Sequence, residues 1–221
     1  MENRFGLILT GGLAPEYHYI EGLFSLRPFI VAADSGLDTA IHYGCDPDLV
    51  VGDMDSLANL AALQEVDSSK VFRYPVDKDE TDTELAVRLM HERGILDYIL
   101  IGGGGGRMDH LFGLLALFDR ESRPREWITH DARMIAVDSS MEFSGFLGAT
   151  VSFFPIGRET CRMESSGLKW NLNGLIWKRG DVGISNKVIS EPFSVEIKTG
   201  ALLLVHHYGE NTGDGGMNAR E

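Results

Sequence analysis

The sequence has few cysteines and no long apolar run. Its two cysteines, Cys45 and Cys161, lie far apart without the spacing of a metal site. We therefore expect reduced thiols in a cytoplasmic protein. No segment is long and apolar enough to cross a membrane. The first residues, Met1–Gly12, lack the basic start, apolar run and small-residue cleavage site of a secretory signal, so we expect none.

Basic residues are also scarce. The chain has 20 Lys and Arg against 33 Asp and Glu, which gives a net charge of −13. This balance argues against nucleic acid or an anionic membrane as the main partner. It does not argue against a nucleotide, because a few cations inside a cleft reverse the local field. Solubility alone is the other explanation of the charge.

Common nucleotide-binding motifs and internal repeats are missing as well. The pattern GxxxxGK[ST] does not occur, and the glycine run Gly102–Gly106 follows a strand well past the first strand–helix unit, where GxGxxG is not usually found. The length of 221 residues is enough for one large domain or two small ones.

Apolar runs alternate with helical segments in the first part of the chain. Continuous apolar runs are typical of buried parallel strands. They occupy Phe5–Gly12, Phe29–Gly36, Asp48–Asp53, Val71–Val76 and Tyr98–Gly104. Between them, Thr81 and Glu84 have capping-box spacing and predict a helix from Thr81 to about Arg93, and a second helix is expected from Met108 to about Arg120. We expect an α/β domain over residues 1–139, with an open, mostly parallel sheet and flanking helices.

The pattern of apolar and polar residues changes after about Val137. Short strand-like runs separated by Gly, Asn and Pro dominate, and no amphipathic helix is evident. This pattern predicts a C-terminal all-β sandwich domain over residues 140–208. The polar, glycine-rich residues 209–221 are expected to form a disordered tail.

Acidic side chains gather where loops leave predicted strands or open predicted helices. They are Asp34, Asp53, Asp55, Asp79, Asp82 and Asp109. Ligands of an open parallel sheet bind beyond the carboxyl ends of its strands, so we expect these loops on one rim. Carboxylates are the hard oxygen ligands that Mg²⁺ prefers, and Mg²⁺ usually arrives bound to phosphates. The pattern predicts a metal-assisted nucleotide enzyme.

Each of these motifs also has a purely structural interpretation. Asp53 and Asp55 would point to the same side of an extended segment and grip a metal, or Asp53 would make an Asx-type hydrogen bond in a surface turn. Asp79 and Asp82 would present oxygens to metal or substrate from a helix start that attracts phosphate, or Asp82 would only interact with the helix dipole. Lys78 would neutralise phosphate charge, or it would be a solvated lysine.

The string GGGGGRMDH is the most distinctive one. Five consecutive glycines are entropically costly for a surface loop, and they let a polyphosphate approach the backbone closely. Arg107 can clamp phosphate oxygens through two N–H groups. Asp109 can bind metal or cap the following helix. His110 can donate to a phosphate, although taken alone it is better explained as a half-buried structural histidine.

Taken together, these motifs resemble the thiamine pyrophosphokinase (thiamine diphosphokinase) family. The matching strings span Val31 to Asn186 and are AADSG, PDLVVGDMDSL, DKDETDTELA, GGGGGRMDH, GLKWNL and GISN. The resemblance implies an α/β domain followed by a β-sandwich, and a homodimer with active sites at its interface. It also implies transfer of the pyrophosphoryl group of ATP to thiamine, with Mg²⁺, to give thiamine diphosphate and AMP.

The resemblance assigns roles to matching positions. It implies catalytic roles for Asp53, Asp55, Asp82 and Asp109, and metal binding by Asp53, Asp55 and Asp82. It implies ATP or phosphate binding by Asp34, Lys78, Arg107 and His110. Two positions depart from the family pattern: Ser35 replaces a glycine of the loop after Asp34, and Lys78 stands where some members have glutamine.

The thiamine contacts come from the second domain. The resemblance implies that Ser185 and Asn186 hydrogen-bond the pyrimidine and that Trp170 stacks on thiamine from the partner subunit. Thiamine is a cation, and tryptophan is the best ring for cation–π contact. Without the resemblance, Trp170 and Trp177 are both better explained as core residues.

Two other functions stay open on the sequence. One is a related pyrophosphokinase that acts on another heterocyclic alcohol such as a pterin, which GISN and Trp170 disfavour. The other is a non-catalytic thiamine or nucleotide sensor, which does not need so many acidic ligands. The general base, the number of metal ions and the nucleotide preference are not determined by the sequence.

Overall fold

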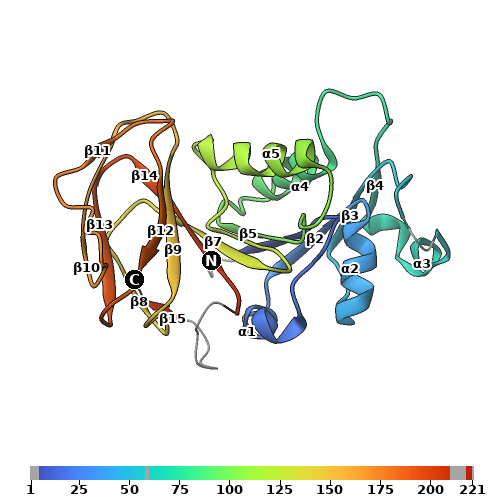
Figure 1. Ribbon diagram of the computed structural model, residues 1–221. Coiled ribbons are helices and arrows are strands. Elements are labelled where there is room, and N and C mark those ends of the chain that lie inside the picture. The colour runs from blue at the N-terminus through green and yellow to red at the C-terminus, as the bar shows by residue number, and fades with distance from the viewer. Residues whose placement is uncertain (1–4, 58–59, 210–217, 221) are drawn as a thin grey trace. The chain divides into compact units, whose positions relative to one another are not determined.

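The computed structural model describes residues 5–57, 60–209 and 218–220 (Figure 1). The chain forms two compact units, one of Met1–Leu114 with Pro124–His130, the other of Leu115–Arg123 with Asp131–Glu221. The second unit begins before residue 140, because strand β7 pairs with β14 and so belongs to the β domain.

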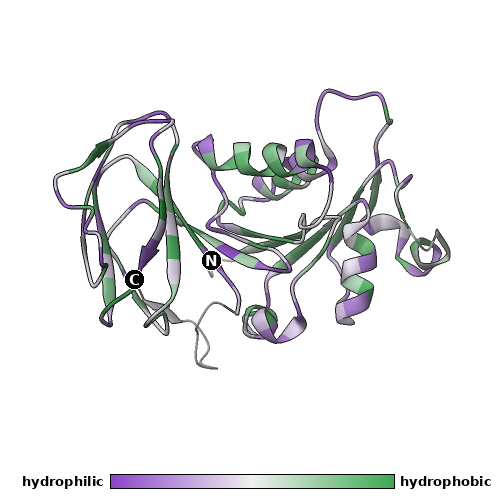
Figure 2. Cartoon of the chain, in the orientation of Figure 1, coloured by the Kyte–Doolittle hydropathy of each residue, from purple (hydrophilic) through white to green (hydrophobic). Residues whose placement is uncertain are grey.

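The first unit is built on a parallel sheet. Its strands are β1 (Gly6–Leu9), β2 (Phe29–Ala33), β3 (Leu49–Gly52), β4 (Val71–Arg73), β5 (Tyr98–Ile101) and β6 (Glu126–Ile128). They pair in the order β6-β5-β1-β2-β3-β4, every pair parallel. Strands β1, β2, β3 and β5 are buried along their whole length, and Figure 2 shows their apolar character. This is the sheet predicted from the continuous apolar runs.

Helices flank this sheet. They are α1 (Glu21–Ser25), α2 (Gly36–Tyr43), α3 (Leu60–Glu65), α4 (Asp82–His91) and α5 (Met108–Ala116), with short 3₁₀ turns η1 (Tyr17–Tyr19) and η2 (Ser68–Lys70); the turn η3 (Leu117–Asp119) belongs to the second unit. Figure 1 shows α2 and α4 on opposite faces of the sheet. The capping box of α4 is confirmed, because Glu84 N–H donates to Thr81 Oγ1 and Thr81 N–H donates to the Glu84 carboxylate. The predicted α/β fold class is confirmed.

The second unit consists of two antiparallel sheets. Their strands are β7 (Ala132–Val137), β8 (Met141–Ser144), β9 (Thr150–Ile156), β10 (Cys161–Ser166), β11 (Ile176–Trp177), β12 (Gly183–Lys187), β13 (Phe193–Thr199), β14 (Ala201–His207) and β15 (Asn218–Arg220). One sheet has the order β12-β9-β14-β7 and the other β11-β10-β13-β8-β15. Phe143, Phe153 and Phe193 belong to the buried core of this unit. The predicted all-β C-terminal domain is confirmed.

The predicted disordered tail lies mostly outside the described residues. Within it, Asn218–Arg220 forms β15, which pairs with β8 and differs from the expected disorder at these positions. Cys45 and Cys161 form no disulfide, and burial raises the pKa of each thiol to about 11. In the described part of the chain, no helix has the length and apolar character needed to cross a membrane.

Candidate active site

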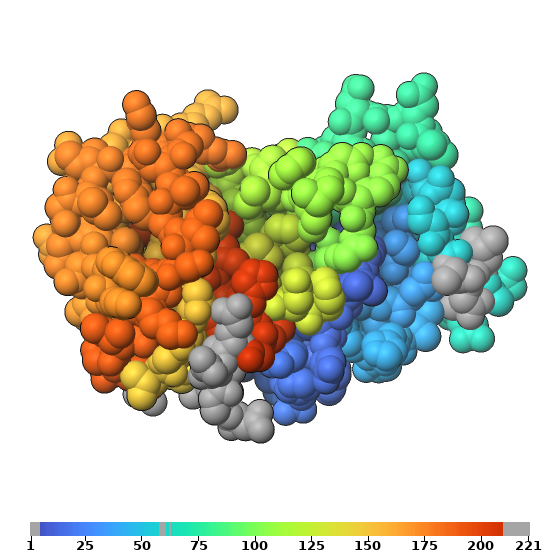
Figure 3. All heavy atoms as spheres, in the orientation of Figure 1, coloured from blue at the N-terminus to red at the C-terminus, as the bar shows by residue number. Residues whose placement is uncertain are grey.

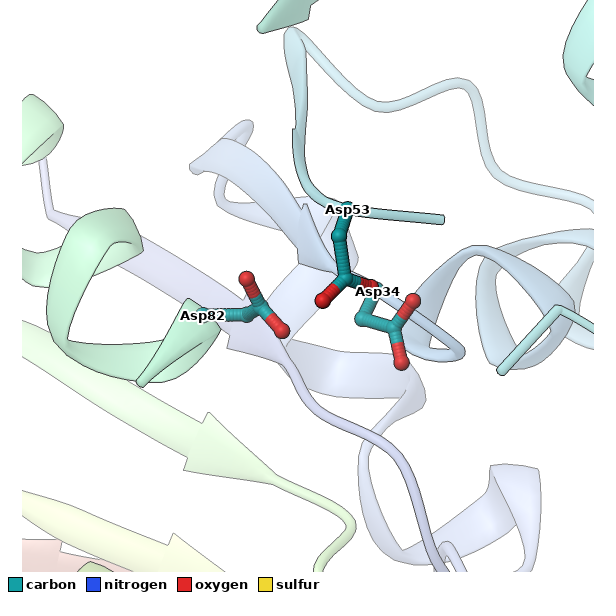
Figure 4. Close-up of side chains that lie close together, drawn as sticks. All are labelled: Asp34, Asp53 and Asp82. Carbon is teal, nitrogen blue, oxygen red and sulfur yellow. The ribbon is translucent and has the colours of Figure 1, made fainter. Parts of the chain in front are cut away.

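Three of the predicted acidic residues meet at the carboxyl edge of the parallel sheet. Asp34 follows β2, Asp53 follows β3, and Asp82 is the first residue of α4. One carboxylate oxygen from each lies within 4.8 Å of the other two (Figure 4). Since β2 and β3 are parallel neighbours, their ends bring Asp34 and Asp53 to the same edge. We call Asp34, Asp53 and Asp82 the acidic group.

A glycine before Asp53 makes room for this acidic group. Gly52 has a φ of 145°, and a Cβ at this position would lie 3.1 Å from the Asp82 Cγ and 3.2 Å from the Asp34 Cβ. Any larger residue would therefore push two carboxylates away. Sequence reasoning missed Gly52, although its place directly before Asp53 in VVGDMDS was a signal.

The backbone at Asp34 is itself strained. Its φ is 47°, in the left-handed region that residues other than glycine rarely adopt. The N–H of Asp34 donates to Val51 O at 2.8 Å, which ties the loop to β3. The next residue, Ser35, has a right-handed φ of −61° and lies against Gly11, so a serine fits where the family pattern has glycine.

A pair of threonines fixes the start of α4. Thr10 Oγ1 at the end of β1 and Thr83 Oγ1 in the first turn of α4 are 3.0 Å apart, and both residues are buried. This bond anchors the helix start that carries Asp82. Neither threonine was identified from the sequence, because the contact joins segments 73 positions apart.

Lys78 neutralises part of the charge of the acidic group. Its ammonium lies 3.1 Å from Asp82 Oδ1 and 3.6 Å from Asp53 Oδ2, and its side chain is only 15% exposed. The interpretation of Lys78 as a solvated lysine is therefore wrong. Burial acts to lower its pKa, but the two carboxylates outweigh burial and raise the pKa, so the lysine stays charged.

The remaining charge is not balanced by protein groups. Burial raises the pKa of Asp82, whereas the backbone N–H of Asp55 is the main cause that lowers the pKa of Asp53. Within the described residues, the buried oxygen Asp34 Oδ1 accepts no hydrogen bond, and the buried Asp82 Oδ1 has the Lys78 ammonium, 3.1 Å away, as its partner. Buried acceptors without donors are costly, and a bound cation would satisfy them. Three carboxylates against one ammonium fit a hard divalent ion such as Mg²⁺.

Asp55 does not join the acidic group. Met54 between Asp53 and Asp55 is buried and has a φ of 66°, so the segment is not extended, and the Asp55 carboxylate is not one of the three that meet. Instead, Asp55 N–H donates to Asp53 Oδ1 at 3.1 Å, which is the Asx-type bond of the structural interpretation. The extended-segment expectation was wrong and the Asx-type bond is present, while metal binding by Asp53 stays a prediction.

The first glycines of the GGGGG run serve packing. Gly103 N–H donates to Gly11 O at 2.8 Å, and Leu13 N–H donates to Gly104 O at 2.7 Å, so this loop pairs with the loop after β1. A Cβ on Gly102 would lie 2.5 Å from a backbone oxygen of that segment. Glycines 102–104 are buried, whereas Gly105 and Gly106 are exposed.

Arg107 and Asp109 form an exposed pair of their own. Arg107 Nε donates to Asp109 Oδ1 at 3.1 Å, and the side chains are 72% and 61% exposed. The guanidinium lowers the pKa of Asp109 to about 2. Asp109 is not part of the acidic group, and His110 is exposed, so its half-buried interpretation was wrong. Figure 3 shows the α5 segment, in yellow-green, at the visible surface.

The predicted thiamine contacts lie in the second unit. Trp170 is 55% exposed, so a core role for it is wrong, whereas Trp177 packs against the core as expected. The ammonium of Lys169 lies 4.5 Å from the Trp170 ring centroid. Ser185 is exposed and has a φ of 60°, but Asn186 is buried and its amide bonds the backbone of Trp170.

Comparisons with known proteins show which family the chain belongs to. The model of the thiamin pyrophosphokinase catalytic domain matches residues 20–127, and that of the thiamin pyrophosphokinase vitamin B1 binding domain matches residues 134–204. Together the two matches cover most of the chain. The chain belongs to the thiamine pyrophosphokinase family.

Individual family members support the same assignment. Thiamine pyrophosphokinase 1 of Arabidopsis thaliana is 28% identical over 71% of this chain, and the match covers 64% of the plant protein, so this chain spans less than two thirds of that relative. The thiamin pyrophosphokinase structure from Geobacillus thermodenitrificans has a TM-score of 0.74 at 25% identity and covers 95% of this chain and 100% of that one. The Bacillus subtilis structure, at 21% identity, has a TM-score of 0.75 over 92% and 99% of the two chains and shows the shared fold.

Proposed function

We propose that the protein transfers the pyrophosphoryl group of ATP to the hydroxyl of thiamine, giving thiamine diphosphate and AMP. The observation that carries this proposal is the acidic group with Lys78, which lies within the residues matched by the catalytic-domain model. The three carboxylates outnumber the one ammonium, and the buried Asp34 Oδ1 has no hydrogen-bond donor among the described residues, which suits a metal ion carrying a triphosphate. The chain's membership of the thiamine pyrophosphokinase family supports thiamine over a pterin alcohol as acceptor.

Mg²⁺ is the ion that we propose for this site. Asp53 and Asp82 would hold it, as the family pattern implies, with Asp34 as the third carboxylate because of its place in the acidic group. When bound, the ion neutralises phosphate charge and orients the triphosphate. Asp55, which the family pattern also places among the ligands, supports Asp53 through its backbone N–H.

The reaction needs one bond to form and one to break. The thiamine hydroxyl oxygen attacks the β-phosphorus of ATP in line, the bond from that phosphorus to the α–β bridging oxygen breaks, and AMP leaves with that oxygen. The hydroxyl proton passes to an aspartate, one of Asp53, Asp55 or Asp82. Asp55 is the candidate whose carboxylate lies outside the acidic group. Positioning and charge neutralisation supply most of the rate enhancement in phosphoryl transfer.

Positive side chains of the same domain would bind the phosphates. Lys78 is held between two carboxylates, and we propose that it turns to a phosphate oxygen when the metal balances them. Arg107 presents an exposed guanidinium beside the two exposed glycines of its loop, where it would reach phosphate oxygens by leaving Asp109. The exposed His110 would donate to the same phosphates.

Trp170 would bind thiamine by cation–π contact. Its exposed ring already has one cation, the Lys169 ammonium, over its face, so the ring can accept a cation there. Ser185 would hydrogen-bond the pyrimidine, as its exposure permits.

We also propose a homodimer in the cytoplasm. The second unit exposes large apolar side chains next to or on its edge strands β11 and β12, including Ile176, Val182 and Ile184. Exposed apolar residues on sheet edges are typical of surfaces that pair with another chain. Light scattering coupled to size-exclusion chromatography tests this: a monomeric mass at micromolar concentration contradicts it.

The activity is tested by incubating the purified protein with ATP, MgCl₂ and thiamine and quantifying AMP and thiamine diphosphate by chromatography. We expect both products in equal amounts, and neither without thiamine. Formation of AMP with a pterin alcohol but not with thiamine would favour the alternative pyrophosphokinase. Calorimetric binding of thiamine and ATP without product would favour a sensor.

A further inference from the structure

The exposed ring of Trp170 stands on a backbone that one buried side chain holds. Asn186 Nδ2 donates to Trp170 O at 2.6 Å, and Trp170 N–H donates to Asn186 Oδ1 at 3.2 Å. A side-chain amide that both donates to and accepts from one residue imitates a neighbouring β-strand. In the described chain, Trp170 follows the end of β10 at Ser166 and is not part of a strand itself.

The bonds of Asn186 continue a short ladder between two segments. Lys169 N–H donates to Lys187 O at 2.8 Å, and Leu168 forms an isolated antiparallel bridge with Val188. The ladder would stop at Lys169 without the amide of Asn186. The side chain therefore extends the pairing by one residue, to the residue that carries the exposed ring.

Local backbone geometry turns Asn186 inward. The pairing of β12 with β9 shifts register between Gly183 and Asn186, and Ser185 there has a φ of 60°. Ser185 is exposed as a result, whereas Asn186 is only 6% exposed. Neighbouring residues of the GISN string thus have opposite environments.

The amide of Asn186 has little capacity left for a ligand. Its oxygen accepts two backbone N–H groups, those of Trp170 and Lys187, the latter at 2.8 Å. An amide oxygen has two acceptor sites, so both are filled. One N–H of Nδ2 already donates to Trp170 O.

We propose that Asn186 is a positioning residue that sets the Trp170 ring through the Trp170 backbone, rather than a direct contact of the thiamine pyrimidine. The proposal rests on the proposed function for the identity of the ligand, but the positioning itself does not. It predicts that the loss of Asn186 loosens the ring before any substrate is present.

Fluorine NMR of the protein labelled with 5-fluorotryptophan reads the ring directly. The chain has three tryptophans, and Trp170→Phe identifies the resonance of Trp170. In Asn186→Ala, we expect this resonance to move and to narrow, while the resonance of the buried Trp127 stays in place. Asn173→Ala is the matched control, because Asn173 Oδ1 also accepts a backbone N–H, that of Ser165, but not one of Trp170. Equal changes in both variants would overturn the proposal.

A double-mutant cycle separates positioning from direct contact. Asn186→Ala is expected to raise the KM for thiamine on the order of tenfold, through the lost hydrogen bonds to Trp170, and to leave the KM for ATP unchanged. If Asn186 acts through Trp170, its removal adds nothing in a Trp170→Ala background. Additive effects would show a direct contact and overturn the proposal.

The activity assay and the fluorine spectrum test the proposed function and the positioning role separately. If the protein forms no thiamine diphosphate at all, the proposed function fails, yet the fluorine resonance still reports whether Asn186 holds the ring. If activity is present but the resonance of Trp170 is unchanged in Asn186→Ala, the positioning role fails and the proposed function stands.

Discussion

The acidic group and the Arg107–Asp109 pair are two charged motifs of the same domain, and the structure treats them in opposite ways. The acidic group is half-buried, is given room by Gly52 and contains a buried oxygen, Asp34 Oδ1, that has no hydrogen-bond donor among the described residues. The Arg107–Asp109 pair is exposed and internally satisfied. The first is organised before any ligand arrives, whereas the second has to exchange its own partner for a ligand.

The pKa values of Asp82 in the acidic group and of Asp109 in the exposed pair are shifted in opposite directions. Burial raises the pKa of Asp82, while Arg107 lowers the pKa of Asp109 to about 2. A bound cation stabilises a buried carboxylate that is repelled by neighbouring carboxylates. The exposed Asp109 carboxylate already has the Arg107 guanidinium as its cation. We therefore expect metal binding to depend on the acidic group far more than on Asp109.

The largest effect is expected from Asp82→Asn. The change keeps the shape but removes one negative oxygen from the acidic group, so we expect kcat to fall on the order of 100-fold or more. AMP release with saturating thiamine measures it. Asp79→Asn is the control, because Asp79 is exposed in the loop before α4 and lies outside the acidic group, and this variant should retain activity. A stable Asp82→Asn protein with full turnover would remove the acidic group from catalysis.

Lys78→Met tests the cation that the acidic group already has. Without the ammonium, Asp53 and Asp82 repel each other, so we expect the metal-free protein to lose about 1–3 kcal/mol of unfolding free energy. Added MgCl₂ should restore more stability to this variant than to the unchanged protein. Thermal unfolding with and without MgCl₂ measures both, and equal stabilisation of the two proteins would contradict the account.

The pH dependence of metal binding follows from Asp82. The pKa of Asp82 in the folded protein lies above the ordinary value of 3.8, so ionisation of Asp82 opposes folding. The contribution of Asp82 to the free energy of unfolding therefore falls as the pH rises from 3.8 through the raised pKa. Metal ligands must be deprotonated, so metal affinity should fall as pH drops through the raised pKa. Mn²⁺ titrations at several acidic pH values measure it. The drop should begin at a higher pH than an ordinary aspartate predicts.

Arg107→Gln should have the smallest effect. The arginine is exposed, so its loss should not alter the unfolding midpoint, while the KM for ATP rises on the order of tenfold through the lost phosphate contact. NMR titration of the Asp109 carboxyl should show its pKa returning from about 2 toward the ordinary value of 3.8. An unchanged pKa would show that Arg107 is not its cause.

The fold could be predicted because burial leaves a periodic trace in the sequence. Continuous apolar runs, such as Asp48–Asp53 around β3, predicted the parallel sheet. The capping box of Thr81 and Glu84 predicted the start of α4. The meeting of Asp34 and Asp53 followed from strand ends at one edge. These features depend on local pattern and on a general rule of sheet topology.

The features of the site that could not be predicted depend on contacts that leave no pattern in the sequence. The left-handed φ of Met54 keeps the segment from Asp53 to Asp55 from being extended, and the Thr10–Thr83 bond joins distant segments. Glycines 102–104 leave no space for a Cβ, because Thr10 O, Leu114 and His130 lie against them in turn. The buried place of Asn186 beside the exposed Ser185 likewise depends on one register shift.

The most direct test of the metal site is a titration of the purified protein with Mn²⁺, followed by electron paramagnetic resonance of the free ion. The account predicts that Asp34→Asn and Asp82→Asn each weaken binding at least about tenfold, whereas Asp109→Asn leaves it unchanged. Equal affinities in all of these proteins, or a loss confined to Asp109→Asn, would contradict the claim that the acidic group holds the divalent ion.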